Sequence, residues 1–290
     1  MATAAFTHHA QIRWGDIDQL GHMNNVVFID LLQQARALWW QSTPAATDLL
    51  GPTDGPDGPV GTVVAELQVE WKRPIFLGQQ VEVRLGTTQV GAARFTIWYE
   101  IIADKEVACL ARSLMAVVAL RTGRILRIPA GVGDYLRSVS GEPDALRPLA
   151  RADGPEPDDP ERMHRFEVES RWSDVDAYGH INNAQYFELF QEARIGFIDE
   201  VDALRDMVVV VARSDLRYRE QAPFRSEPYT ICSAVTRVGS SSFDMRAILL
   251  RDKDDQASVL AEQWVTLVRI DAEGRPKPLS VDESAALMGA

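Results

Sequence analysis

The sequence contains few of the residues on which metal and disulfide sites depend, with two cysteines and five histidines in 290 residues. Cys109 and Cys232 do not fall at equivalent positions of the internal repeat described below, so we expect two unrelated buried thiols. No His/Cys cluster has the spacing of metal ligands, and we expect no metal site. A reducing, cytoplasmic setting suits such a chain.

The sequence also lacks long apolar runs and an excess of basic charge. No run approaches the roughly 20 apolar residues that a membrane-spanning helix needs, and the N-terminus has no signal-peptide pattern. The formal net charge is -12 and the pI is about 4.9. A field of that sign repels nucleic acid and anionic membranes, so neither is an expected partner. A phosphate-bearing ligand would need a local basic patch.

The clearest feature present is an internal repeat. Residues 13–36 match residues 171–194 at 12 of 24 positions without a gap. Both copies contain the pattern Arg-Trp-x-Asp-x-Asp-x-x-Gly-His-x-Asn-Asn. A match this dense predicts two equivalent units in one chain.

Each motif precedes a helical pattern and a series of strand-like runs. Apolar residues recur at i, i+3, i+4, i+7 and i+11 from Phe28 and again from Tyr186, which is one face of a helix. A Pro-, Gly- and Asp-rich loop is expected over 43–61, and strands over 10–14, 62–71, 80–87, 95–102 and 107–120. One helix with about five antiparallel strands predicts an α+β fold of two tandem units. Each sheet is expected to wrap around its long helix, and the units to pair as a pseudo-dimer.

The stretch between the copies contains Gly, Pro, Asp and Glu with few apolar residues, which is typical of a linker. We therefore predict an N-terminal domain over 1–137, a linker over 138–163 and a C-terminal domain over 164–290.

The candidate catalytic residues are Asp18 and His22 in the first motif and Asp176 and His180 in the second. A helix N-terminus offers free N–H groups and partial positive charge that can hold a polarised carbonyl oxygen. A carboxylate beside it can act as general base or as nucleophile. The imidazole can orient the carboxylate or the substrate.

The same residue types are also common in turns and helix caps, whatever a protein does. The substrate-binding candidates are therefore open between capping and substrate contact: Gly21, Asn24 and Asn25, and Gly179, Asn182 and Asn183. Asp16 and Asp174 are interpreted as turn or arginine-pairing residues. Arg36 and Arg194 are expected to pair with acids at the helix surface.

The motif resembles that of the hotdog-fold acyl-CoA thioesterases of the 4-hydroxybenzoyl-CoA type, over both halves of the chain. It is also similar to the plant acyl-acyl-carrier-protein thioesterases, which join two hotdog units. The resemblance implies hydrolysis of an acyl thioester without metal or covalent cofactor, with Asp18 and Asp176 as the catalytic carboxylates. The plant enzymes have a catalytic Asn where this chain has Leu20 and Tyr178, so the resemblance favours acyl-CoA over acyl carrier protein as substrate.

Some alternatives remain open at this point. A hotdog hydratase or dehydratase acting on acyl-CoA, or a non-catalytic acyl-CoA-binding regulatory protein, would have the same fold. Five basic residues near strand ends could meet CoA phosphates or be solvated surface charge: Lys72, Arg73, Arg217, Arg219 and Arg225. A homo-oligomer of double-hotdog chains is possible.

Overall fold

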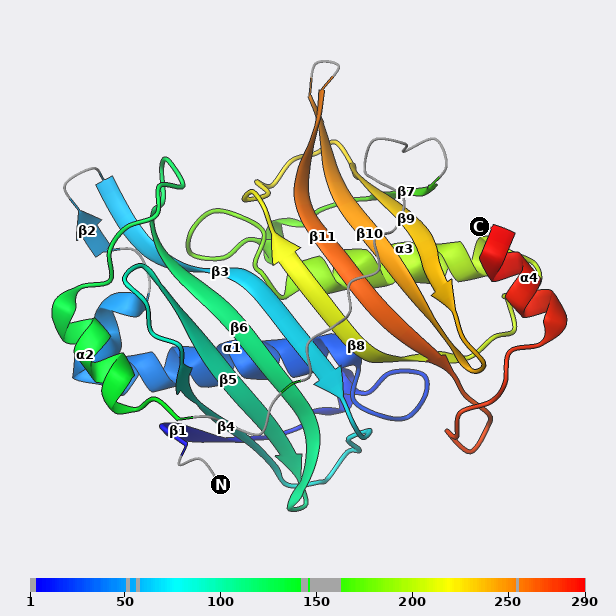
Figure 1. Ribbon diagram of the computed structural model, residues 1–290, viewed down its shortest axis with the longest axis horizontal. Coiled ribbons are helices and arrows are strands. Elements are labelled where there is room, and N and C mark those ends of the chain that lie inside the picture. Colours follow the sequence, from blue (N-terminus) through cyan, green and yellow to red (C-terminus); the bar gives the residue numbers. More distant parts are fainter. Residues whose placement is uncertain are drawn as a thin grey trace. The chain divides into compact units, whose positions relative to one another are not determined.

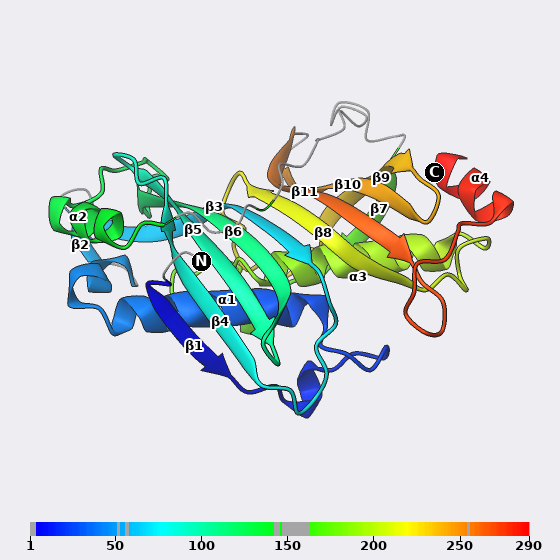
Figure 2. The same ribbon diagram turned by 60° about the horizontal axis from the view of Figure 1, so that its bottom comes forward.

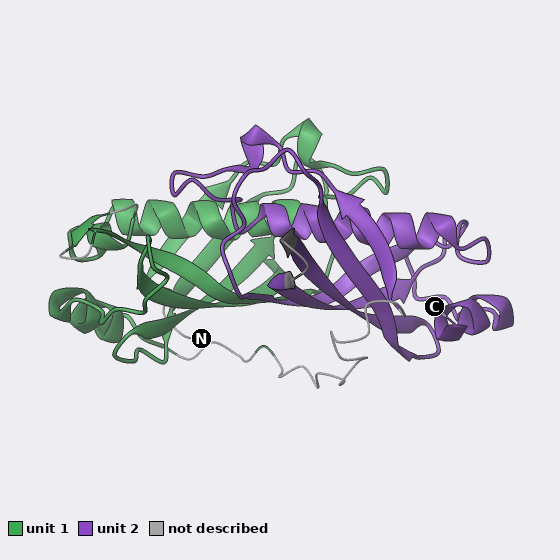
Figure 3. Ribbon diagram, turned by 90° about the horizontal axis from the view of Figure 1, so that it is seen from above, with its two compact units in different colours: residues 1–147 green, residues 148–290 purple. Residues whose placement is uncertain are grey.

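The computed structural model describes residues 4–50, 53–55, 58–141, 146, 163–253 and 256–289. The chain divides into two compact units, residues 1–147 and 148–290, coloured separately in Figure 3. Because most of the predicted linker lies outside the described residues, the domain boundaries at 137 and 164 stay a prediction. So does the pairing of the units as a pseudo-dimer.

Unit 1 is an antiparallel sheet with one long helix against it (Figure 1). Its elements are β1 (Phe6–Ala10), η1 (Trp14–Asp16), α1 (Asn25–Gln41), η2 (Pro44–Leu49), β2 (Thr53–Gly55), β3 (Gly58–Trp71), β4 (Val81–Thr88), β5 (Arg94–Ala103), β6 (Glu106–Ala119) and α2 (Ala130–Ser138). The strand order is β1-β4-β5-β6-β3, and β2 pairs with β3. Strands β3 to β6 lie where the alternation of Val, Ile and aromatic residues predicts them.

Unit 2 repeats this arrangement. Its elements are β7 (His164–Val168), η4 (Trp172–Asp174), α3 (Gln185–Glu200), β8 (Val209–Tyr218), β9 (Tyr229–Val238), β10 (Ser242–Lys253), β11 (Gln256–Arg269) and α4 (Val281–Gly289). The order β7-β9-β10-β11-β8 matches that of unit 1 strand for strand. Figure 2 shows α1 and α3 each running along one face of their own sheet. The predicted α+β class, with an antiparallel sheet wrapped around one long helix in each half, is confirmed.

Three local predictions differ from the structure. The first strand is β1, which ends at Ala10 instead of beginning there, because residues 14–16 at the start of the motif form η1. The predicted loop over 43–61 contains η2, with Pro44 at its first position, and the β2–β3 hairpin. The short helices α2 and α4 were not predicted.

The helix and sheet of each unit enclose an apolar core. In unit 2, Phe197 of α3 packs with Phe243, Met245 and Leu267 from the sheet, and Leu287 of α4 joins the same cluster. Fully burying one such side chain stabilises a fold by about 1.5–3 kcal/mol. The last helix of each unit, α2 or α4, thus packs against the core of its own unit. In unit 1, the Trp39 indole N–H of α1 donates to the Tyr135 hydroxyl of α2 at 2.8 Å.

The predicted surface ion pairs of Arg36 and Arg194 are wrong. Both arginines are buried. Arg36 donates to the Tyr99 hydroxyl at 3.0 Å, and Arg194 donates to the Gln263 side-chain oxygen at 3.3 Å. Burial lowers the pKa of Arg194 to about 10. Both side chains point inward because each lies on the same helix face as the core residues of its helix.

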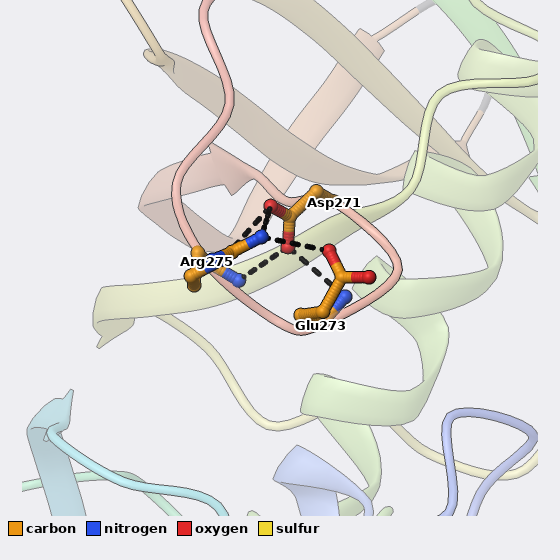
Figure 4. A network of polar contacts seen from close by, with 3 residues as sticks. All are labelled: Asp271, Glu273 and Arg275. Atoms are coloured by element: carbon orange, nitrogen blue, oxygen red, sulfur yellow. Dashed lines mark hydrogen bonds and ion pairs between the residues drawn. The ribbon is translucent and has the colours of Figure 1, made fainter.

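The turn after β11 carries a local polar network (Figure 4). The Asp271 carboxylate accepts from the backbone N–H of Arg275 at 2.8 Å and from its guanidinium at 3.1 Å. Glu273 is a second acid on the same guanidinium, at 2.9 Å. These bonds lower the pKa of Asp271, with the backbone bond contributing most. The network fixes the turn that leads the chain toward α4.

Candidate active site

The first motif forms a closed turn directly before α1. Ile17 and Met23 form an antiparallel bridge, and the Asp18 N–H donates to the His22 carbonyl at 2.9 Å. The Gly21 N–H returns to the Asp18 carbonyl at 3.0 Å, and Gly21 has φ +80°, a conformation that favours glycine. The role of Gly21 is therefore to close the turn that brings the Asp18 and His22 side chains together.

The second motif has the same backbone. Val175 bridges Ile181, the Asp176 N–H donates to the His180 carbonyl at 3.0 Å, and Gly179 has φ +79°. The sequence repeat is thus a repeat of turn geometry, and both copies place an Asp and a His at the same points of the turn.

Asp16 and Asp174 hold the start of the turn. The Asp16 carboxylate accepts from the Arg13 backbone N–H at 2.8 Å and from its guanidinium at 2.8 Å. Burial raises the pKa of Asp16, but the hydrogen bonds and charge of Arg13 outweigh burial and lower it. Asp174 accepts from the Arg171 N–H at 2.7 Å. The interpretation of both as turn residues is confirmed.

Each candidate carboxylate accepts a backbone hydrogen bond through its Oδ1. Asp18 Oδ1 accepts from the Leu20 N–H at 2.8 Å, and Asp176 Oδ1 accepts from the Tyr178 N–H at 2.9 Å. The other oxygen of Asp18 lies 3.6 Å from His22 Nδ1. An Asp held by one oxygen keeps its second oxygen available to take a proton from water or to attack a carbonyl.

In the second site, burial is the main influence on the candidate carboxyl group. Burial raises the pKa of Asp176, against the opposing effects of the Tyr178 N–H and of His180. In the part of the chain that the structure describes, the buried Nδ1 of His180 has no hydrogen-bond partner. A raised carboxyl pKa makes Asp176 a stronger base than an ordinary aspartate once it is ionised.

The two asparagines of each pair differ in their hydrogen bonds. Asn24 Oδ1 accepts from the Val26 N–H at 2.8 Å, and Asn182 Oδ1 accepts from the Ala184 N–H at 2.9 Å. Asn24 is therefore the N-cap of α1. Asn182 makes the same bond in the turn before α3, whose N-cap is Ala184. Among the described residues, the backbone N–H groups of Asn25 and Asn183 have no acceptor. Asn25 is the first residue of α1, and Asn183 lies two residues before the start of α3.

The basic residues considered for CoA phosphates are largely engaged within the protein. Lys72 pairs with Glu70 at 2.9 Å, and Arg219 pairs with Glu262 at 2.6 Å. The other three have contacts as well: Arg73 pairs with Glu106, Arg225 lies 4.3 Å from the Tyr229 ring, and Arg217 lies 5.8 Å from the Trp264 ring. The structure thus favours the interpretation as surface charge.

Two tyrosines beside the second motif were not singled out from the sequence. Tyr186 lies in the first turn of α3 and Tyr218 ends β8, with ring centroids 5.1 Å apart and nearly perpendicular planes. Unit 1 has Phe28 and Trp71 at these places, 6.3 Å apart. Comparing the two repeats position by position beyond the motif could have found this difference.

The described residues contain neither a metal-ligand cluster nor a membrane-spanning helix. They bring no three His, Cys, Asp or Glu side chains together as a metal would require. None of their helices has the length and hydropathy to cross a bilayer. Cys109 and Cys232 are free and buried, as expected.

Comparison with known protein families gives the family of this chain. The family model of the thioesterase-like superfamily matches residues 12–136 and again 170–287. The chain belongs to that superfamily. Its two units are tandem hotdog domains, and its enzyme class is thioester hydrolase.

Individual relatives agree with this membership. The long-chain acyl-CoA thioesterase FadM of Escherichia coli K12 is 28% identical over 110 residues, which is 36% of this chain and 81% of FadM. An acyl-ACP thioesterase from Bacteroides thetaiotaomicron has a TM-score of 0.66 at 16% identity, covering 90% of this chain and 96% of that one. The 12:0-ACP thioesterase from Umbellularia californica has a TM-score of 0.66 at 17% identity, covering 91% and 94%. At such identities the solved structures show the fold alone.

Proposed function

We propose that this thioester hydrolase cleaves acyl-CoA to the free acid and CoA, using Asp18 and Asp176. The observation that carries the proposal is the pairing, in each motif, of a carboxylate positioned by a backbone hydrogen bond to Oδ1 with a free backbone amide a few residues later, at or just before the long helix. A thioester carbonyl can accept from the Asn25 or Asn183 N–H while the free carboxylate oxygen takes the proton of an attacking water. The partial positive charge of the helix start supports the developing oxyanion.

Several features support acyl-CoA over a carrier-protein thioester. FadM, which matches this chain at 28% identity, is named a long-chain acyl-CoA thioesterase. The net charge of -12 disfavours docking of an acidic protein partner. Two structural relatives are named for acyl-ACP, so an acyl-ACP substrate belongs in the same assay.

The test is a panel of acyl-CoAs of different chain length, including an aromatic one, with a thiol reagent that detects released CoA. Thioester hydrolysis gives free CoA, hydration of an enoyl-CoA would instead indicate a hydratase, and binding without turnover would indicate a regulatory protein. Faster release from acyl-ACP than from every acyl-CoA would contradict the proposed substrate.

The proposed carboxylates are tested by the double variant Asp18→Asn/Asp176→Asn. Asn keeps the size and the acceptor oxygen but removes the base, so we expect turnover to fall by about 10²–10⁴. Thermal unfolding, followed by circular dichroism, reports whether the fold is retained. A folded double variant with near-normal turnover would contradict this mechanism.

Base and nucleophile are separated by a single turnover with enzyme in excess in ¹⁸O-labelled water. Direct attack by water puts ¹⁸O into the product acid. Attack by the carboxylate first forms an anhydride, and water attack on its aspartyl carbon leaves an unlabelled oxygen in the product. An unlabelled product acid, measured by mass spectrometry, therefore identifies the carboxylate as the nucleophile.

A further inference from the structure

The connection between β8 and β9 is fastened to the second motif by tyrosine side chains. The Ile181 N–H, next to His180, donates to the Ala222 carbonyl at 2.8 Å. The Ala222 N–H in turn donates to the Tyr186 hydroxyl at 3.0 Å. The Tyr218 hydroxyl donates to the Asn183 carbonyl at 2.7 Å. The motif turn, the start of α3 and this connection are therefore linked by a continuous set of hydrogen bonds.

The hydroxyl protons in this region are not all used. Tyr218 gives its proton to Asn183, and Tyr229 gives its proton to the Pro223 carbonyl. Tyr186 is 3% exposed and uses its oxygen as an acceptor, and among the described residues its own proton has no acceptor. A buried donor in a native protein ordinarily has a partner. The partner of this proton is therefore expected to arrive with a ligand.

The position of Tyr186 indicates that this ligand is the proposed substrate. It lies in the first turn of α3, three residues after the free amide of Asn183. Burial raises the pKa of Tyr186 and the Ala222 N–H opposes this, while Tyr229 and then Asp176 add to the increase, so the Asp176 carboxylate is within electrostatic reach. A thioester oxygen or the attacking water at Asp176 is an acceptor of the right kind.

Unit 1 has no counterpart to this proton. Phe28 occupies the place of Tyr186 and has no hydroxyl, and the Ile75 carbonyl accepts from Met23 at 2.7 Å just as Ala222 accepts from Ile181. The two sites therefore share the turn and the backbone contact but differ in the tyrosine.

We propose that Tyr186 is a positioning residue of the second site, which holds the Ala222 connection with its oxygen and directs its proton to a substrate or water oxygen at Asp176. This rests on the proposed function. It makes the second site the more strongly organised of the two.

The test uses the full chain with Asp18→Asn as parent, so that unit 2 carries the turnover. Adding Tyr186→Phe removes one hydroxyl, and we expect kcat to fall by about three- to ten-fold, the value of one hydrogen bond, with KM changed less than two-fold. The matched control, Tyr229→Phe, removes another hydroxyl from the same connection and is expected to leave kcat within two-fold. Melting temperatures of both variants report on folding.

The outcomes separate this proposal from the proposed function. An active parent whose kcat is unaffected by Tyr186→Phe, or reduced as much by Tyr229→Phe, overturns the role of Tyr186 and leaves thioester hydrolysis standing. An inactive parent with an active wild type also overturns it, because unit 2 is then not a working site. A wild type inactive on every acyl thioester overturns the proposed function itself.

Discussion

At the scale of single residues, the second motif carries a carboxylate in an unfavourable environment. Burial raises the pKa of Asp176, so the folded state disfavours its charged form relative to the unfolded chain. Asp16 is the opposite case, because Arg13 lowers its pKa in spite of burial. Near neutral pH, ionised Asp176 therefore reduces the free energy of unfolding, and ionised Asp16 increases it. Unfavourable burial of a carboxylate is common where it serves a reaction.

The contrast gives a stability prediction with a defined sign. We expect Asp176→Asn to raise the melting temperature at pH 7.5, because it removes a partly desolvated charge. The gain should shrink as pH falls toward the raised pKa, since the folded wild type then takes up the proton more readily than the unfolded chain. Melting curves between pH 7.5 and 4.5 measure both.

Asp16→Asn is the matched control, for which we expect the opposite effect on stability. Folding lowers the pKa of the Asp16 carboxyl, so the ionised carboxylate stabilises the fold above the ordinary value of 3.8. This stabilisation is lost as pH falls through the folded value. We expect this variant to melt lower than wild type at pH 7.5, with a smaller difference at acidic pH. Destabilisation by Asp176→Asn at pH 7.5 would contradict the sign given to the second site.

At the scale of elements, α3 approaches β7 more closely than a side chain on the helix would allow. A Cβ on Gly196 would lie 2.4 Å from the Phe166 ring. Unit 1 has Leu38 at the place of Gly196 and His8 at the place of Phe166. The helix of unit 1 therefore carries a full side chain at the position where α3 has none.

We therefore expect Gly196→Ala to destabilise the protein. The gain in helix propensity is about 1 kcal/mol, and overpacking against the half-buried Phe166 ring costs about 1–3 kcal/mol. Gly131 in α2 is the matched control, because a Cβ there meets nothing within 4 Å. Gly131→Ala should keep only the propensity gain and raise the midpoint in urea, whereas Gly196→Ala should lower it. Equal shifts of the two midpoints would mean that Phe166 moves aside freely.

At the scale of the whole molecule, two units of one fold carry two versions of one site. Both motifs keep the Asp, Gly, His and Asn-Asn pattern, so neither has lost its candidate groups. Their surroundings differ at two positions of the repeat: Tyr178 for Leu20 and Tyr186 for Phe28. Duplication has preserved the backbone of the turn while the neighbouring side chains have diverged.

The two sites are therefore expected to contribute unequally to turnover. Asp18→Asn and Asp176→Asn, made singly, should lower kcat by clearly different factors, with the larger loss from Asp176→Asn because the second site is the more organised one. Steady-state kinetics of both variants on the best substrate of the acyl-CoA panel measure this. A loss of half from each variant would indicate two equivalent, independent sites.

Much of the fold could be predicted from the sequence because the signals are local. Turn chemistry at Gly21 and Gly179, the 3.6-residue period after each motif and the β-branched runs all act within a few residues. They predicted the turn, the long helices and the strands β3 to β6, and the repeat predicted that the second half would follow the first. The helices α2 and α4 were missed because they are short and complete a core built by distant segments.

The sequence by itself determined the family, the repeat and the candidate carboxylates, since a dense motif records residue types at fixed spacing. Only the tertiary structure decided what surrounds them. The Tyr218 hydroxyl reaches Asn183 across 35 residues of chain, and Arg36 reaches Tyr99 across 63. Desolvation of Asp176 likewise depends on which segments pack over it. Such contacts depend on packing between segments far apart in sequence, and no local pattern of residues encodes them.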